Sequence, residues 1–212
     1  MARKLIYVPI IHSQADLGSL AERLPAMARE RLGAETWRRH RRRTEEFWRK
    51  LRVKVMARVS QELADTPGCG VAAQPPRGWD NLRVYQDGMP AAGETARRIV
   101  QELAEKGSPN YQLVGELMAR GAHLERTEQA DLLKQEYRMI REIITASEPA
   151  ERDRARQQYS RISESLLEQR DRFIAERIGE TLREGEVGLL FIGALHRVQE
   201  YLPEDIEVIP VG

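Results

Sequence analysis

The sequence predicts an α/β fold, a small, mostly parallel sheet of about four strands that carries a large helical layer. Two short apolar runs at opposite ends of the chain, residues 4–11 and 187–193, lack polar alternation, which predicts strands buried on both faces. Long segments with apolar residues at helical spacing lie between them. We expect one domain, residues 1–212, with helical excursions at about 34–65 and 93–184.

The composition is typical of a soluble, helix-rich globular protein, with 41% apolar and 32% charged residues. The net charge of +1 gives no global field that would steer the chain to nucleic acid or to acidic membranes. The single cysteine, Cys69, excludes an internal disulfide and is expected in a loop. The first apolar run contains Pro9 and stops at His12, too short for a signal peptide, and no stretch approaches the roughly 20 apolar residues of a membrane span. A cytoplasmic location is therefore expected.

The segment 34–65 is predicted to be one long helix, after a shorter one over residues 19–32. Its apolar face is formed by residues that recur at steps of three, four or seven: Trp37, Thr44, Trp48, Leu51, Val55, Val59 and Leu63. The arginine-rich run 38–43 falls mostly off this face. Such a run suits a nucleic-acid helix with tryptophans as stacking platforms, or a solvated surface. The shared stripe of the aromatics and the acidic neighbours favour the solvated surface.

Proline and glycine mark residues 66–80 as a loop before a strand at 82–86. A helix is expected over 93–106, and Ser108 with the following proline is a typical start for the next.

Residues 124–127 are expected to be a connector, with Thr127 capping a helix that extends to about 147. A last long helix covers about 150–184. The chain closes with a turn and a strand that begins at Ile206.

Polar side chains follow three of the predicted strands, namely His12, Asp87 and His196. In open parallel sheets, ligands bind at the edge where the strands have their carboxyl ends. Asp16 and the Arg170–Asp171 pair are expected behind these three residues. At 100° per residue, Arg170 and Asp171 fall on or beside the apolar face of the last helix, where a charged pair must be satisfied.

Two imidazoles and a carboxylate suit zinc, manganese or iron, so His12, Asp87 and His196 are the candidate metal ligands. A divalent metal would lower the pKa of a bound water and make it a nucleophile. Without a metal or other cofactor, one histidine would be a general base oriented by a carboxylate. Arg170 would bind a substrate carboxylate or phosphate, or brace the site with Asp171. The sequence contains no nucleotide-binding glycine motif and no GxSxG motif.

The segment 170–178, with the later Gly193-Ala194-Leu195-His196, resembles the C-terminal signature of the TraB/TIKI superfamily, which is related to the erythromycin-esterase and ChaN-like fold. That group pairs a GxxH-type motif after its first strand with an Arg-Asn helix and a second GxxH. The first motif here is Pro9-Ile10-Ile11-His12, without the glycine, and the Arg-Asn pair is Arg170-Asp171. Asp87 stands where the group has a glutamate. The chain also looks like short prokaryotic proteins that share its Tyr-Gln-Asp-Gly-Met-Pro turn.

Some members of this superfamily look like metal-dependent proteases, some like metal-free esterases with a histidine base, and others bind haem or act in signalling. The resemblance implies a hydrolase of amide or ester bonds, metal-dependent or with a histidine base, that acts on a small molecule or a peptide. The alternative is a non-enzymatic binding or regulatory protein on the same fold. No nucleic-acid or membrane partner is expected. The polar first half of the last helix suits either a homodimer interface or a solvated surface.

Overall fold

A computed structural model describes residues 3–11, 34–65 and 78–211. Its five strands form one parallel sheet in the order β3-β2-β4-β1-β5. The strands are β1 (Arg3–Ile10), β2 (Leu82–Gln86), β3 (His123–Glu125), β4 (Val187–Gly193) and β5 (Ile206–Pro210). The expected α/β architecture is confirmed, and the sheet has five strands where about four were predicted.

The additional strand is β3, which the sequence analysis assigned to a connector. It pairs with β2 in parallel, with His123 opposite Arg83. A strand of three residues is too short to display an apolar pattern, so local sequence could not reveal it. The predicted cap is also wrong, because the next helix begins at Ala130 and the Thr127 hydroxyl donates to the carbonyl of Gln86.

The helices follow the predicted segments closely. They are α2 (Ala34–Asp65), α3 (Gly93–Glu105), α4 (Pro109–Ala119), α5 (Ala130–Thr145) and α6 (Pro149–Thr181), with short 3-10 turns η2 (Trp79–Asn81) and η3 (Val198–Tyr201). Ser108 caps α4 as expected, since its side chain accepts a hydrogen bond from the Tyr111 amide at 3.1 Å. The predicted helix at 19–32, His12, Asp16 and Cys69 lie outside the described residues.

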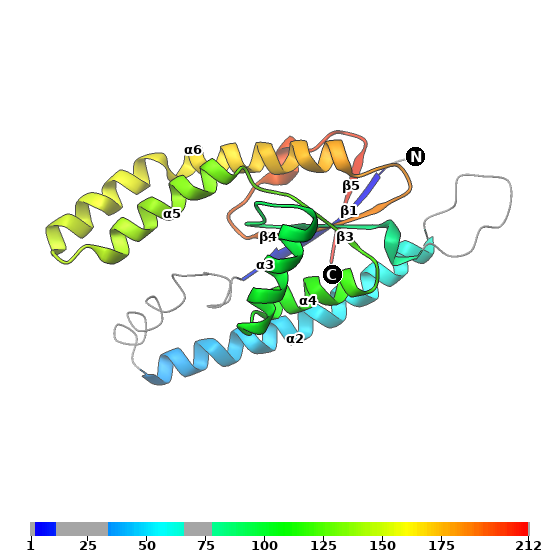
Figure 1. The fold of residues 1–212 in the computed structure, drawn as a ribbon, viewed down its shortest axis with the longest axis horizontal. Helices are drawn as coiled ribbons and strands as arrows, with labels where there is room; N and C mark the ends of the chain where they lie inside the picture. The colour runs from blue at the N-terminus through cyan, green and yellow to red at the C-terminus, as the bar shows by residue number, and fades with distance from the viewer. Residues whose placement is uncertain (1–2, 12–33, 66–77, 212) are drawn as a thin grey trace, which may run out of the picture.

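Helices cover both faces of the sheet (Figure 1). On one face, α2, α3 and α4 pack against β-strand residues such as Val84 and Leu189. On the other, the second half of α6 and η3 pack against residues such as Leu5 and Leu190. The predicted stripe of α2 is buried from Trp48 onward, while the earlier Trp37 is half-buried. Trp37 and Trp48 therefore belong to the packed side of α2.

None of the described helices is long and apolar enough to cross a membrane.

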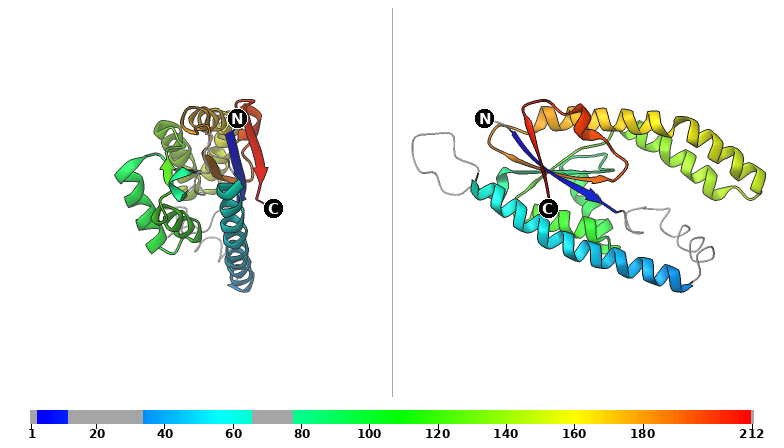
Figure 2. Two further views of the ribbon diagram at one scale, coloured as in Figure 1. Left: turned by 90° about the vertical axis from the view of Figure 1, so that its right-hand side faces the viewer. Right: turned by 180° about the vertical axis from the view of Figure 1, so that it is seen from behind.

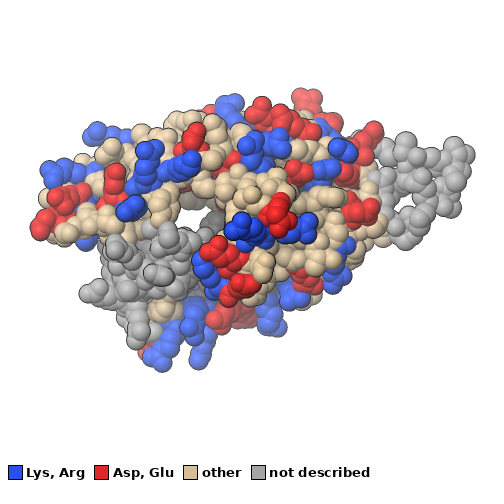
Figure 3. All heavy atoms as spheres, in the orientation of Figure 1, with Lys and Arg blue, Asp and Glu red and all other residues tan. Residues whose placement is uncertain are grey.

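α5 and the first half of α6 form a helical hairpin that extends beyond the sheet (Figures 1 and 2). No described residue of α5 is buried, and the first buried residue of α6 is Leu166. Basic and acidic side chains are interspersed on the visible face of this hairpin and of α2 (Figure 3). In α2, Arg41 pairs with Glu45 and Lys50 with Glu46 one turn away. These pairs fit the solvated-surface interpretation of the arginine-rich run.

The chain leaves the neighbouring strands β2 and β4 toward opposite faces of the sheet. After β2 it enters α3 and α4 on one face, and after β4 it enters η3 on the other. In an open parallel sheet, connections that diverge in this way open a crevice beside the carboxyl ends of the two strands. The residues that follow β2 and β4 are therefore where the topology predicts ligand binding.

Candidate functional site

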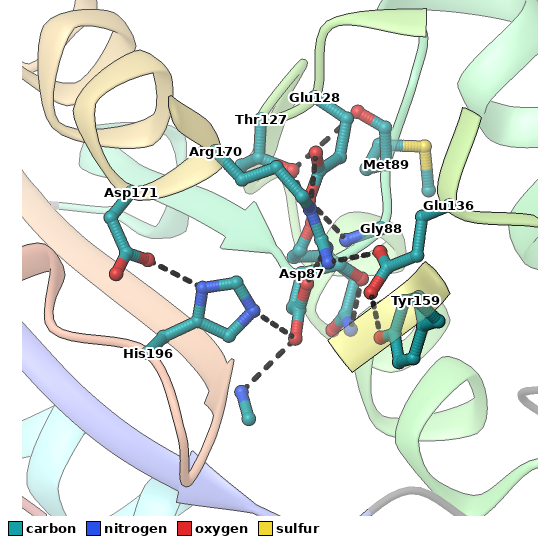
Figure 4. Close-up of polar contacts among 12 residues, drawn as sticks. Asp87, Gly88, Met89, Thr127, Glu128, Glu136, Tyr159, Arg170, Asp171 and His196 are labelled. Atoms are coloured by element: carbon teal, nitrogen blue, oxygen red, sulfur yellow. Dashed lines mark hydrogen bonds and ion pairs between the residues drawn. The ribbon is translucent and has the colours of Figure 1, made fainter. Parts of the chain in front are cut away.

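His196 lies between two carboxylates at this point of the sheet (Figure 4). Its Nδ1 atom is 2.5 Å from Asp171 Oδ1, and its Nε2 atom is 3.5 Å from Asp87 Oδ2. The second oxygen of Asp171 accepts a hydrogen bond from the Arg197 amide at 2.8 Å. Only 5% of the His196 side chain is exposed, so the ring is fixed in place by buried partners.

The two ring nitrogens have different chemical roles. A neutral imidazole carries one N–H, and with that hydrogen on Nδ1 it donates to Asp171. The lone pair of Nε2 then faces the Asp87 carboxylate. His196 Nε2 and Asp87 Oδ2, 3.5 Å apart, are then two acceptors that can bind a proton, the O–H groups of a water molecule or a cation. A general base and a metal ligand both need one ring nitrogen with an available lone pair.

Asp87 is oriented by backbone and side-chain donors. Its own amide donates to the carbonyl of Phe191 at 2.9 Å, a hydrogen bond at the end of the pairing between β2 and β4. Its Oδ1 atom accepts from Arg170 Nη2 at 2.8 Å and its Oδ2 atom from the Gly193 amide at 3.1 Å. These contacts aim the carboxylate at the end of β4, where His196 lies.

Arg170, on α6, joins three carboxylates from three parts of the chain (Figure 4). It binds Glu128 through Nη2 at 2.6 Å and Nε at 3.1 Å, Glu136 through Nη1 at 2.8 Å, and Asp87 through Nη2. Burial by itself would lower the pKa of Arg170, but the hydrogen bonds and charges of these acids outweigh it and raise the pKa above its usual value. These contacts fit a bracing role, with Asp87, Glu128 and Glu136 as partners, and leave the binding of a substrate anion to other groups.

Glu128 follows β3 and is fully buried. Burial raises the pKa of its carboxyl. The guanidinium of Arg170 opposes this shift, and the negative charge of Asp87 increases it. The Gly88 amide donates to Glu128 Oε1 at 3.2 Å. The sequence pattern does not reveal Glu128 because it does not reveal β3. A strand ending at Glu125 places this acid at the same edge as Asp87.

Two further residues reach the site from the hairpin. Glu136 on α5 accepts from Arg170, and its other oxygen accepts from the Tyr159 hydroxyl of α6 at 3.0 Å. Burial, together with the charge of Glu136, raises the pKa of Tyr159 to about 12. No local sequence signal marks this pair, because it depends on how two helices lie against each other.

The structure thus brings together four predicted site residues: Asp87, Arg170, Asp171 and His196. His12 and Asp16 lie outside the described residues. The last residue of β1, Ile10, pairs with Gly193, so β1 and β4 end at the same level. His123 is exposed at the start of β3, away from this edge.

The donors present fit part of a metal site. His196 Nε2 and Asp87 Oδ2 are one nitrogen and one oxygen donor at the edge, and Asp171 holds the other ring nitrogen as carboxylates do for metal-bound histidines. Within residues 3–11, 34–65 and 78–211, no group of three or more His, Cys, Asp and Glu side chains is placed to hold a metal ion. The third ligand of the predicted set, His12, is not among those residues.

Comparison of the chain with protein-family models finds no match. Comparisons with curated proteins and with solved structures find none either. Function is therefore inferred from the residues of the site.

Proposed function

We propose that this protein is a hydrolase of ester or amide bonds in which His196 is the general base. The observation that most directly supports a general base is the position of His196 between Asp171 and Asp87 (Figure 4). These residues lie where the connections that follow β2 and β4 diverge. General-base catalysis uses a buried imidazole in which a carboxylate holds one nitrogen and the other nitrogen keeps a lone pair for the proton of a donor.

In the proposed reaction, Nε2 of His196 takes a proton from a water molecule as the water oxygen forms a bond to the substrate carbonyl carbon. The imidazolium produced lies between Asp171 and Asp87, whose charges stabilise it. When the tetrahedral intermediate collapses, the bond to the leaving oxygen or nitrogen breaks and His196 returns the proton to that atom. Arg170 and the Gly193 amide keep Asp87 aligned throughout.

A divalent metal is compatible with this proposal. His196 and Asp87 would hold it, together with His12, and it would supply an activated water near neutral pH. The resemblance to the TraB/TIKI superfamily, and through it to the erythromycin-esterase/ChaN-like fold, supports a hydrolase of either kind. The parallel sheet and the placement of Gly193-Ala194-Leu195-His196 at its carboxyl edge agree with that fold.

The test is a panel of p-nitrophenyl esters and peptide amides assayed with the wild type, His196→Gln and the control His123→Gln. The control removes an exposed histidine away from the site. We expect hydrolysis by the wild type and the control, and a loss of about 100-fold or more in kcat for His196→Gln. Equal rates for His196→Gln and the wild type would refute the proposal.

Metal dependence is tested on the same samples. The metal content of the wild type is compared with that of the His12→Ala, His196→Ala double variant, and the activity is measured after treatment with a chelator. About one ion per chain, lost in the variant, supports the metal-dependent form. Activity that survives removal of the metal supports the histidine base. A folded wild type without hydrolytic activity would favour the non-enzymatic alternative.

A further inference from the structure

Two exposed apolar side chains border the proposed site. Among the described residues, the large apolar side chains that are exposed are Ile11, Val53, Tyr137 and Leu195. Ile11 and Leu195 each lie just past the carboxyl end of a strand, and these strands, β1 and β4, are neighbours. Each also directly precedes a histidine of the predicted site, His12 or His196. Half of these exposed side chains are therefore at one edge of the sheet.

Hydrogen bonds on both sides hold the backbone of the turn that contains Leu195. The His196 amide donates to the Gly193 carbonyl at 3.1 Å, which closes the turn that contains Leu195. The Gly193 amide is bound to Asp87 and the Arg197 amide to Asp171. Leu195 lies in this turn, and 80% of it is exposed.

Ile11 is held in a similar way. Its carbonyl accepts a hydrogen bond from the buried Trp48 indole at 3.1 Å, and its side chain is 47% exposed. A single exposed leucine or isoleucine needs no explanation. Two on adjacent strand ends, with their backbone held by hydrogen bonds and with Leu195 directly before His196, suit the packing of an apolar group of a ligand.

The charges at the site disfavour an anionic ligand. Arg170, the buried cation, is already paired with Asp87, Glu128 and Glu136. Asp171 adds a further carboxylate next to His196. Even with Arg197, which is exposed next to His196, these four acids outnumber the two arginines, so a substrate carboxylate or phosphate would meet an excess of negative charge.

We propose that the substrate is an uncharged ester or amide with an apolar acyl group, which packs against Leu195 and Ile11 while the scissile carbonyl lies at His196. This rests on the proposed hydrolase function and names its substrate class. Each methylene removed from water is expected to raise kcat/KM about fourfold until the apolar surface is covered.

The test uses p-nitrophenyl acetate, butyrate and hexanoate, with the p-nitrophenyl half-ester of succinate as the charged counterpart of butyrate. Rates of His196→Gln are subtracted as background. The wild type should prefer hexanoate over acetate, and butyrate over the succinate half-ester. Leu195→Gln should lose the chain-length dependence through a higher KM, with kcat little changed. Val53→Gln, which alters an exposed valine on α2, should behave as the wild type does.

A flat chain-length series, or the same series in Leu195→Gln, would overturn the inference while leaving the hydrolase proposal in place. Preference for the succinate half-ester would overturn it as well, and would point to Arg197, the exposed cation next to His196.

If no ester is hydrolysed, the hydrolase proposal fails. The apolar contact at Leu195 is then tested by ligand binding. Hexanamide is then titrated into methyl-labelled protein, in which the Leu195 methyl signals are identified by their absence from Leu195→Gln. A shift of those signals supports the apolar contact, and unchanged signals overturn it.

Discussion

Replacement of Arg170 by leucine tests the bracing role of this residue in the site. The substitution keeps much of the apolar stem on α6 and removes the guanidinium. Asp87 and Glu128 then lose their cation, although their side chains are only 4% and 0% exposed. Removal of one partner from a buried ion pair costs about 3–5 kcal/mol, because the other charge is left without compensation. At about 2–4 °C per kcal/mol for a domain of this size, Tm should fall by roughly 6–20 °C.

The loss of unfolding free energy in Arg170→Leu should depend on pH. Burial raises the pKa of Glu128, and Arg170 partly offsets that rise. The pKa of Glu128 should therefore be higher in Arg170→Leu than in the wild type. A group whose pKa is higher in the folded state stabilises the fold below its unfolded pKa, about 4.3 for glutamate. That contribution is lost as the pH rises through the folded pKa. The difference in unfolding free energy between the wild type and Arg170→Leu should therefore be largest at neutral pH and narrow toward about pH 4–5.

Urea and thermal unfolding followed by circular dichroism measure both effects. Arg172→Leu is the control. Arg172 is on the same helix but exposed, and its partners among the described residues are Glu168 and the ring of Tyr201. Its unfolding midpoints should stay close to those of the wild type. Arg170→Leu with the stability of Arg172→Leu at neutral pH would refute the view that Arg170 compensates buried charge.

Further substitutions test other parts of the account. Glu128→Gln should become more stable relative to the wild type as the pH rises above about 4.3, because it removes a carboxyl whose ionisation opposes folding; a difference in urea midpoint that does not change with pH would contradict this. Tyr159→Phe removes the hydroxyl that Glu136 accepts from and should cost about 0.5–1.5 kcal/mol in urea unfolding; an unchanged midpoint would mean that the bond contributes nothing. Ile178→Ala opens space in the core between α6 and the sheet and should cost about 2–5 kcal/mol; a loss well below this range would contradict the observed packing.

Periodicity predicted the parts of the site that depend on a single helix or strand. A count of 100° per residue placed Arg170 and Asp171 on the packed side of α6, and both are buried. The apolar runs at β2 and β4 placed Asp87 and His196 just past the strand ends, where they meet. These inferences worked because long apolar patterns set which side of an element faces inward.

The remaining partners depend on tertiary arrangement. β3 has three residues and no periodic pattern, so neither the strand nor Glu128 beyond it could be inferred. Glu136 and Tyr159 meet only because α5 and α6 pair in one particular register. The sequence left open whether Arg170 binds a substrate anion or braces the site with Asp171. Its pairing with Glu128 and Glu136 likewise follows from which elements lie across the sheet edge.

The central claim is that Asp171 and His196 act as one catalytic unit. A double-mutant cycle on ester hydrolysis, with Asp171→Asn, His196→Gln and the double variant, tests it most directly. If Asp171 acts by holding His196, its loss lowers kcat by about 10²–10⁴, and the double variant is no slower than His196→Gln alone. Losses that multiply in the double variant, or Asp171→Asn with the wild-type kcat, would contradict the account.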